Sequence, residues 1–109
     1  MKDPTTILPH YKLKLFITGA SPNSVRAVKN IRTICDEYIS DRYTLEVVDI
    51  YLHPELAATE QVIAVPLLIK YFPSPVKRLI GNMSNRAQVL KGLQITDEIK
   101  SETERATNI

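Results

Sequence analysis

KLKLFITGASPNSVRAVKNIRTI, residues 12–34, has the pattern of a buried strand, a short loop and a capped helix in immediate succession. Leu13, Leu15 and Ile17 alternate onto one face of the strand. Phe16 lies on the other face, so little of the strand is left for water, which is typical of a sheet that is covered on both sides. The stretch therefore predicts half of a β-α-β unit, around which the rest of the chain can be placed.

The start of the helix is predicted by local chemistry. Ser21 is a good N-cap, and Pro22 behind it loses no hydrogen bond in the first turn. Apolar side chains then recur at three- and four-residue spacing, so one face of the helix should pack on the sheet. The expected buried face consists of Val25, Val28, Ile31, Cys35 and Tyr38 or Ile39.

Five further elements are expected after the break at residues 40–42. They are a parallel strand over 43–50, a short helix over 55–61, strands over 67–71 and 76–80 that pair across the turn at 73–75, and a last helix capped by Ser84 with Val89, Leu90 and Leu93 buried. This order, β-α-β-(α)-β-β-α, is that of a thioredoxin-like α/β domain. We expect a flexible lead-in over 1–10, a single domain over 11–95 and a flexible acidic tail over 96–109.

Composition excludes several classes of protein. The 109 residues are 44% hydrophobic and 24% charged, which is ordinary for one globular domain. The single cysteine excludes an internal disulfide, and the two histidines are not clustered with other ligands, so no metal or cofactor is expected. The sequence contains neither an apolar run of about 20 residues nor an apolar signal core. These features predict a cytoplasmic protein without a membrane span.

Charge is distributed unevenly along the chain. Residues 1–95 carry 12 basic and 8 acidic side chains, a net of +4, whereas residues 96–109 carry 2 and 4, a net of −2. The basic residues are dispersed and form no nucleic-acid-binding motif, so no nucleic-acid partner is expected. A mildly basic body fits an acidic protein partner.

Catalytic chemistry is not expected. A redox enzyme of this fold needs a low-pKa cysteine at the start of the first helix, where the sequence instead has Ser-Pro-Asn-Ser at 21–24. Cys35 lies about three turns further along, on the face predicted to be buried. Asp49, at the end of a buried strand, must find partners for its charge, and we assign it a structural role.

Several segments together resemble the KaiB family of clock proteins, over about residues 11–95. They are LKLFI with a following Gly19, SPNSVRA at 21–27, VDI at 48–50, HPELA at 53–57, IAVP at 63–66, PSPV at 73–76, and IGNMSNR with Val89 and Leu90 over 80–90. The resemblance implies a non-enzymatic thioredoxin-like protein. It also implies that the protein binds KaiC, a hexameric ATPase and autokinase, and modulates its phosphorylation state.

The resemblance further implies two folds for one sequence. Besides the thioredoxin-like monomer, the family has a homotetrameric resting form with the order β-α-β-β-α-α-β. A homodimer or homotetramer is therefore expected at rest. Prolines and glycines interrupt the segment that would convert, and two packings that differ by a few kcal/mol can coexist. The fold-switch or turn residues are Pro66, Pro73, Pro75, Gly81 and Gly92.

The partner-binding residues that the resemblance implies are Arg26, Gln61, Ala64, Lys70, Lys77 and Arg78. In cyanobacterial relatives the positions of Glu46 and Gln61 are basic, and that of Thr44 holds a small residue. Thr44 and Glu46 lie where the family contacts KaiA, so KaiA binding is not expected here. The outcome would be a KaiC-only partnership in clock or stress-adaptation signalling. The alternative is a thioredoxin-like binding module with a different partner.

Overall fold

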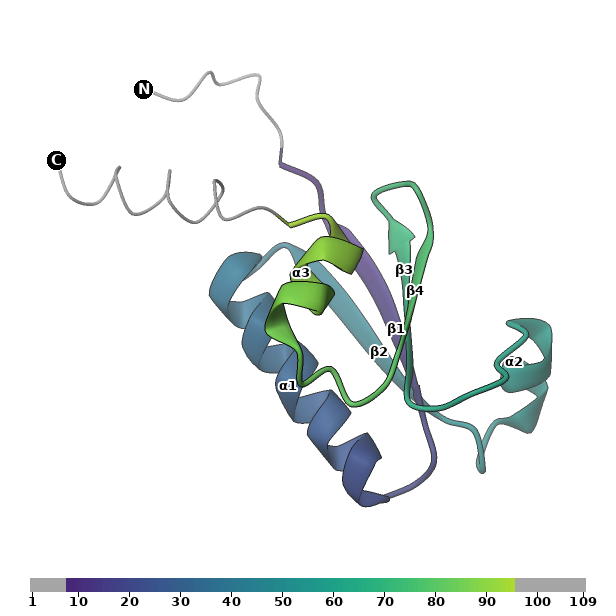
Figure 1. Ribbon diagram of the computed structural model, residues 1–109. Helices are drawn as coiled ribbons and strands as arrows, with labels where there is room; N and C mark the ends of the chain where they lie inside the picture. Colours follow the sequence, from purple (N-terminus) through teal and green to yellow (C-terminus); the bar gives the residue numbers. More distant parts are fainter. Residues whose placement is uncertain (1–7, 96–109) are drawn as a thin grey trace, which may run out of the picture.

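Four strands form one mixed sheet in the order β2-β1-β3-β4 (Figure 1). The computed structural model describes residues 8–95, and the strands are β1 (Tyr11–Ile17), β2 (Tyr43–Asp49), β3 (Leu67–Phe72) and β4 (Lys77–Ile80). β1 runs parallel to β2 and antiparallel to β3, and β4 is antiparallel to β3. The strand expected over 43–50 is parallel to the first strand, and the strand expected over 76–80 is antiparallel to the strand before it, so both predicted pairings are confirmed.

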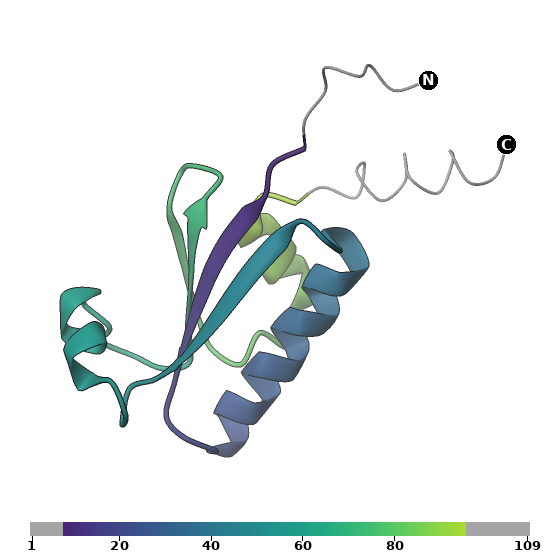
Figure 2. The same ribbon diagram turned by 180° about the vertical axis from the view of Figure 1, so that it is seen from behind.

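Helices lie on both faces of this sheet. α1 (Pro22–Tyr38) and α3 (Arg86–Leu93) cover one face, and α2 (Pro54–Thr59) lies at the other side, as the two opposite views show (Figures 1 and 2). The observed order β-α-β-α-β-β-α is the thioredoxin-like order that the sequence predicts. The acidic tail at 96–109 and most of the lead-in, residues 1–7, lie outside the described residues.

Two apolar clusters hold the layers together. The larger cluster joins Leu13 and Leu15 of β1 to α1 and α3, and the smaller cluster lies on the opposite face around Phe16. The alternation of β1 predicted from the sequence is therefore confirmed. Since Leu15 and Phe16 are both fully buried, β1 is the central element of the sheet on which the helices pack.

The prediction that Val25 is buried on the sheet is wrong. Its side chain is 56% exposed, and the buried stripe of α1 is Ser24, Ala27, Ile31, Ile34 and Cys35. The stripe begins one residue earlier than hydrophobicity suggested, because small Ser24 is held under the β1–α1 loop by a hydrogen bond from the Thr18 N–H to its Oγ at 3.1 Å.

The predicted cap of the last helix is also wrong by one residue. Asn85 is the N-cap of α3, and its Oδ1 accepts from the Gln88 N–H at 3.1 Å. Ser84 instead donates its backbone N–H to Oδ1 of Asn82. Asparagine and serine are nearly equal N-caps, so local preference alone does not choose between these neighbours.

Gly92 has a packing role in α3. A Cβ at this position would lie 2.5 Å from Cδ2 and 2.9 Å from Cγ of Leu79 on β4. Such distances are far below van der Waals contact, so an alanine at this position would require the Leu79 side chain to move. The sequence analysis placed Gly92 among the fold-switch or turn residues. The structure shows that it lies inside α3 and packs closely against Leu79.

Candidate functional site

Three hydroxyl groups occupy the start of α1, the position of the reactive thiol in a redox enzyme of this order. The Ser21 Oγ caps the helix by accepting from the Ser24 N–H, and it donates to the Ser24 Oγ at 2.7 Å. The Thr18 Oγ1 lies 3.2 Å from the Ser21 Oγ. These groups satisfy one another and hold the loop in place, with no thiol among them.

Cys35 lies well away from this helix start, fully buried in the larger apolar cluster. Burial first, and the charge of Asp36 second, raise the pKa of Cys35 to about 12, and Arg32 opposes the shift. A thiol with such a pKa holds its proton at neutral pH and is a poor nucleophile. The thiol therefore serves as apolar packing.

Asp49 organises the loops that follow β1 and β2. One carboxylate oxygen, Oδ1, accepts from the Gly19 N–H at 3.1 Å and from the Tyr51 N–H at 2.9 Å. Gly19 has a φ of +53°, which favours glycine. The structural role expected for Asp49 is borne out by these contacts, since the carboxylate ties two neighbouring loops together.

Gln61 and Arg78 are brought together by the end of α2 and the middle of β4. The Arg78 guanidinium donates to the backbone oxygens of Glu60 and Gln61, the latter at 3.5 Å. Gln61 adopts a φ of +55°, so its backbone turns at this point. Two residues 17 apart in sequence thus form one exposed polar site on the side of the sheet where α2 lies.

Lys70 does not lie on an exposed basic face, as the sequence analysis expected. Its side chain is fully buried on the α3 side of the sheet. The Nζ donates to the carbonyl oxygen of Pro73 at 2.7 Å and to Oε1 of Gln94 at 2.8 Å. Burial, followed by the charge of Lys77, lowers the pKa of Lys70. The alternation of β3 predicts an inward side chain at this position, but the positive charge of lysine led the sequence analysis to expect an exposed one.

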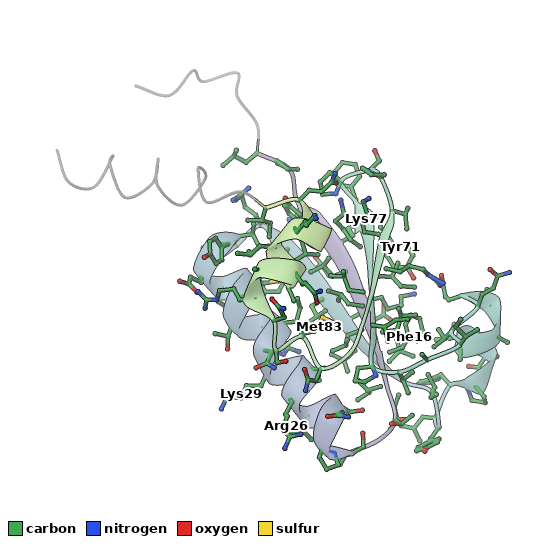
Figure 3. All side chains as sticks on the ribbon, in the orientation of Figure 1. Phe16, Arg26, Lys29, Tyr71, Lys77 and Met83 are labelled. Carbon is green, nitrogen blue, oxygen red and sulfur yellow. The ribbon has the colours of Figure 1, made fainter. Side chains whose placement is uncertain are left out.

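The remaining predicted binding residues lie on different elements. Arg26 is exposed on the first half of α1, and its guanidinium donates to Oδ1 of Asn23 at 3.4 Å. Lys77 is exposed at the start of β4 and lies at the opposite end of the molecule from Arg26 (Figure 3). Ala64 is half-buried between α2 and β3. The structure therefore joins Gln61 to Arg78 and leaves Arg26 and Lys77 apart.

Four of the five predicted fold-switch or turn residues lie at unusual backbone geometry, whereas Gly92 lies within α3. The peptide bonds before Pro66, Pro73 and Pro75 are all cis, and Gly81 has a φ of +120°. The Gly81 N–H donates to the carbonyl oxygen of Pro66 at 2.9 Å, so the entry to β3 and the exit of β4 are held together.

Exposed apolar side chains near this end of the sheet were missed by the sequence analysis. Ile63 is 92% exposed, and Tyr51 and Leu52 are each more than 70% exposed. Val25 lines a hollow of about 400 Å³ with Ile17, Gly19 and Ala20 as neighbours. The signal available in the sequence was the pair Tyr-Leu in a loop just before His-Pro, where no buried element is expected.

The positions of Thr44 and Glu46 line a second hollow, of about 290 Å³, on the uncovered part of the sheet. Glu46 pairs in register with Lys14, and the Lys14 Nζ lies 5.5 Å from the centre of the Tyr71 ring. Burial first, and the negative charge of Glu60 nearby, raise the pKa of Tyr71 to about 12. This surface therefore carries both signs of charge.

Within residues 8–95, no helix is long and apolar enough to cross a membrane. The same residues contain no group of three or more potential metal ligands.

Comparison with known proteins gives a consistent result. The family model described as the KaiB domain matches residues 14–95. The chain is 43% identical over 91 residues to the circadian clock oscillator protein KaiB of Gloeothece citriformis, covering 83% of this chain and 86% of that protein. It is also 43% identical over 88 residues to the protein of the same name from Thermosynechococcus vestitus, covering 81% and 82% of the two chains.

Solved structures agree on the fold. The N-terminal domain of Synechococcus elongatus SasA superposes with a TM-score of 0.63 at 21% identity, covering 85% of this chain and 91% of that one. Mitochondrial thioredoxin 3 of Saccharomyces cerevisiae superposes with a TM-score of 0.64 at 15% identity, covering 79% and 78%. At such identities the likeness shows the thioredoxin-like fold alone.

Proposed function

The chain belongs to the KaiB family, and we propose that it is a non-enzymatic cytoplasmic protein that binds a KaiC-like hexameric ATPase and autokinase. Binding modulates the phosphorylation state of that partner, in clock or stress-adaptation signalling. The observation that carries this proposal is the family match over residues 14–95, almost the whole of the described domain, to relatives named for a circadian clock.

The absence of catalysis is supported by the start of α1. The hydroxyl groups of Ser21 and Ser24 are hydrogen-bonded to each other, and that of Ser21 also caps the helix. The Cys35 thiol, with a pKa of about 12, is unsuited to electron transfer. A thioredoxin-like domain with this helix start acts through its surface.

The docking face, as we define it, comprises Arg26, Gln61, Ala64, Lys77 and Arg78. These residues do not form one continuous patch, because Gln61 and Arg78 lie together whereas Arg26 and Lys77 lie at opposite ends of the molecule, so a partner that contacts them all must extend along it. Lys70 is left out because its ammonium group is buried. Two exposed apolar side chains, Val25 beside Arg26 and Ile63 beside Ala64, add area from which a partner would exclude water. Arginine surrounded by apolar side chains is typical of the energetically important part of a protein interface.

A partner of the KaiA type is not part of this assembly. Glu46 puts a carboxylate where cyanobacterial relatives have a basic residue, and Thr44 lines the same hollow. A partner surface built to meet a cation would there meet an anion, at a cost of several kcal/mol. The system therefore has two components, with the chain resting as a homodimer or homotetramer.

The second candidate is a binding module of the same fold with a different partner. It is favoured by the same change at Glu46 and by the loss of a positive charge at Gln61. Failure to bind a KaiC-like ATPase, together with capture of another protein by the docking face, would select it.

Association with a KaiC-like ATPase, measured with and without ATP, tests the proposal. We expect binding in at least one nucleotide state and a loss of affinity of about 10-fold for Arg26→Glu. Arg32→Glu is the matched control, because Arg32 is exposed further along the same helix and outside the docking face. No binding in any nucleotide state would refute the proposed function, and unchanged binding by Arg26→Glu would remove Arg26 from the docking face.

A further inference from the structure

β4 forms one edge of the sheet. In the order β2-β1-β3-β4 it pairs with β3 alone among the strands of residues 8–95. An edge strand has backbone N–H and C=O groups on its free side that no neighbouring strand satisfies. Ile80, at its end, is 64% exposed. This edge is therefore open to a further segment of chain.

A groove of about 680 Å³ lies between this edge and α3. Lys77 and Arg78 from β4 and Lys91 from α3 line it, but the Arg78 guanidinium is held on the opposite side of the sheet by Glu60 and Gln61, so Lys77 and Lys91 supply the positive charge. The described residues that line it include no aspartate or glutamate. Gly92 and Gln94 complete its α3 side. The buried ammonium of Lys70 lies behind Lys77, to which it is paired in register. The groove therefore favours an anionic occupant.

The chain itself supplies a segment of the opposite charge. Residues 96–109 carry Asp97, Glu98, Glu102 and Glu104 against two basic residues. They begin at the rim of the groove, because Gln94 lines it and the described part of the chain ends at Ile95. Fourteen residues reach about 46 Å when extended, whereas a four-residue strand is about 13 Å long. Reach is therefore ample.

We propose that the acidic C-terminal segment, residues 96–109, docks in the groove along the free edge of β4 of its own chain. Docking covers Lys77, which belongs to the docking face, so the segment competes with an external partner. This regulatory consequence rests on the proposed function, whereas the docking itself does not. A tethered segment competes at a high effective concentration, so even weak charge pairing is sufficient.

The test uses the full chain and a variant with a neutralised tail, in which Asp97→Asn, Glu98→Gln, Glu102→Gln and Glu104→Gln are combined. We expect the backbone amide signals of β4 and Lys91 to differ between the two proteins. The difference should shrink as salt is raised, because the pairing is electrostatic. Lys91→Glu should shift the amide signals of residues 96–109. The matched control Lys29→Glu, at an exposed position of α1, should leave these signals unchanged.

Unchanged β4 amides in the neutralised variant would overturn the docking. A difference that disappears on dilution would overturn docking within one chain, because the segment would then come from a second copy. We also expect the neutralised variant to bind the KaiC-like ATPase about 3- to 10-fold more tightly. Equal affinity would overturn the regulatory role. If the ATPase binds neither protein, the proposed function fails, and the amide comparison still decides the docking.

Discussion

Among single side chains, the reactivity of the Cys35 thiol distinguishes a packing role from a redox role. The side chain is fully buried, and the pKa of its thiol is raised to about 12, mainly by burial. At pH 8 we expect the native protein to react with a disulfide reagent only as fast as it unfolds. The same protein in denaturant should react at once, which provides the control. Rapid reaction of the native chain would return redox chemistry to consideration.

The same shift predicts how stability depends on pH. The unfolded chain releases the thiol proton above a pH of about 9, whereas the folded chain keeps it up to a pH of about 12. The free energy of unfolding should therefore fall as pH rises through this window. Tyr43 and Tyr71, whose pKa values are also raised to about 12 mainly by burial, add to the fall above pH 10.

At the level of helices and strands, the contact between α3 and β4 predicts an unusual response to alanine. Gly92→Ala in an isolated helix would be stabilising by about 1 kcal/mol. Here the new methyl group would overlap Leu79, so we expect a loss of about 1–3 kcal/mol in the free energy of unfolding. With Leu79→Ala already present, Gly92→Ala should instead stabilise. Stabilisation of the otherwise unchanged protein, measured by urea unfolding, would contradict this packing role.

The sequence was sufficient for elements with strong local chemistry. Ser21 and Pro22 define the start of α1, and the alternation in β1 assigns its two faces, because capping and period need only neighbouring residues. Val25 was expected to be buried and is exposed, whereas Lys70 was expected to be exposed and is buried. For Lys70, the alternation of β3 already places the side chain inward, and for Val25, the buried stripe of α1 begins at Ser24, which a hydrogen bond from the Thr18 N–H holds under the loop.

For the molecule as a whole, the proposed resting form predicts a second arrangement of the second half of the chain. We expect a homodimer or homotetramer at high protein concentration and the thioredoxin-like monomer on dilution, because the proposed resting form is an assembly. Mass measured across a concentration series, with amide signals recorded at each step, checks this. A monomer with a single set of signals at every concentration would exclude switching.

The candidate site was less predictable than the fold. Residues on one element, such as Arg26, could be assigned to a surface from periodicity. The meeting of Gln61 with Arg78 could not, because it depends on how α2 turns back toward β4. Contacts between residues so far apart in sequence arise from tertiary packing. They leave no local pattern in the sequence from which they could be predicted.

Lys70 gives the molecule a built-in reporter. Its ammonium group is enclosed between the turn after β3 and the last turn of α3, with oxygens of Pro73 and Gln94 around it. An acylating reagent can reach that nitrogen only while these two pieces are separated. The rate of labelling at Lys70 would therefore report how often the second half of the chain opens locally.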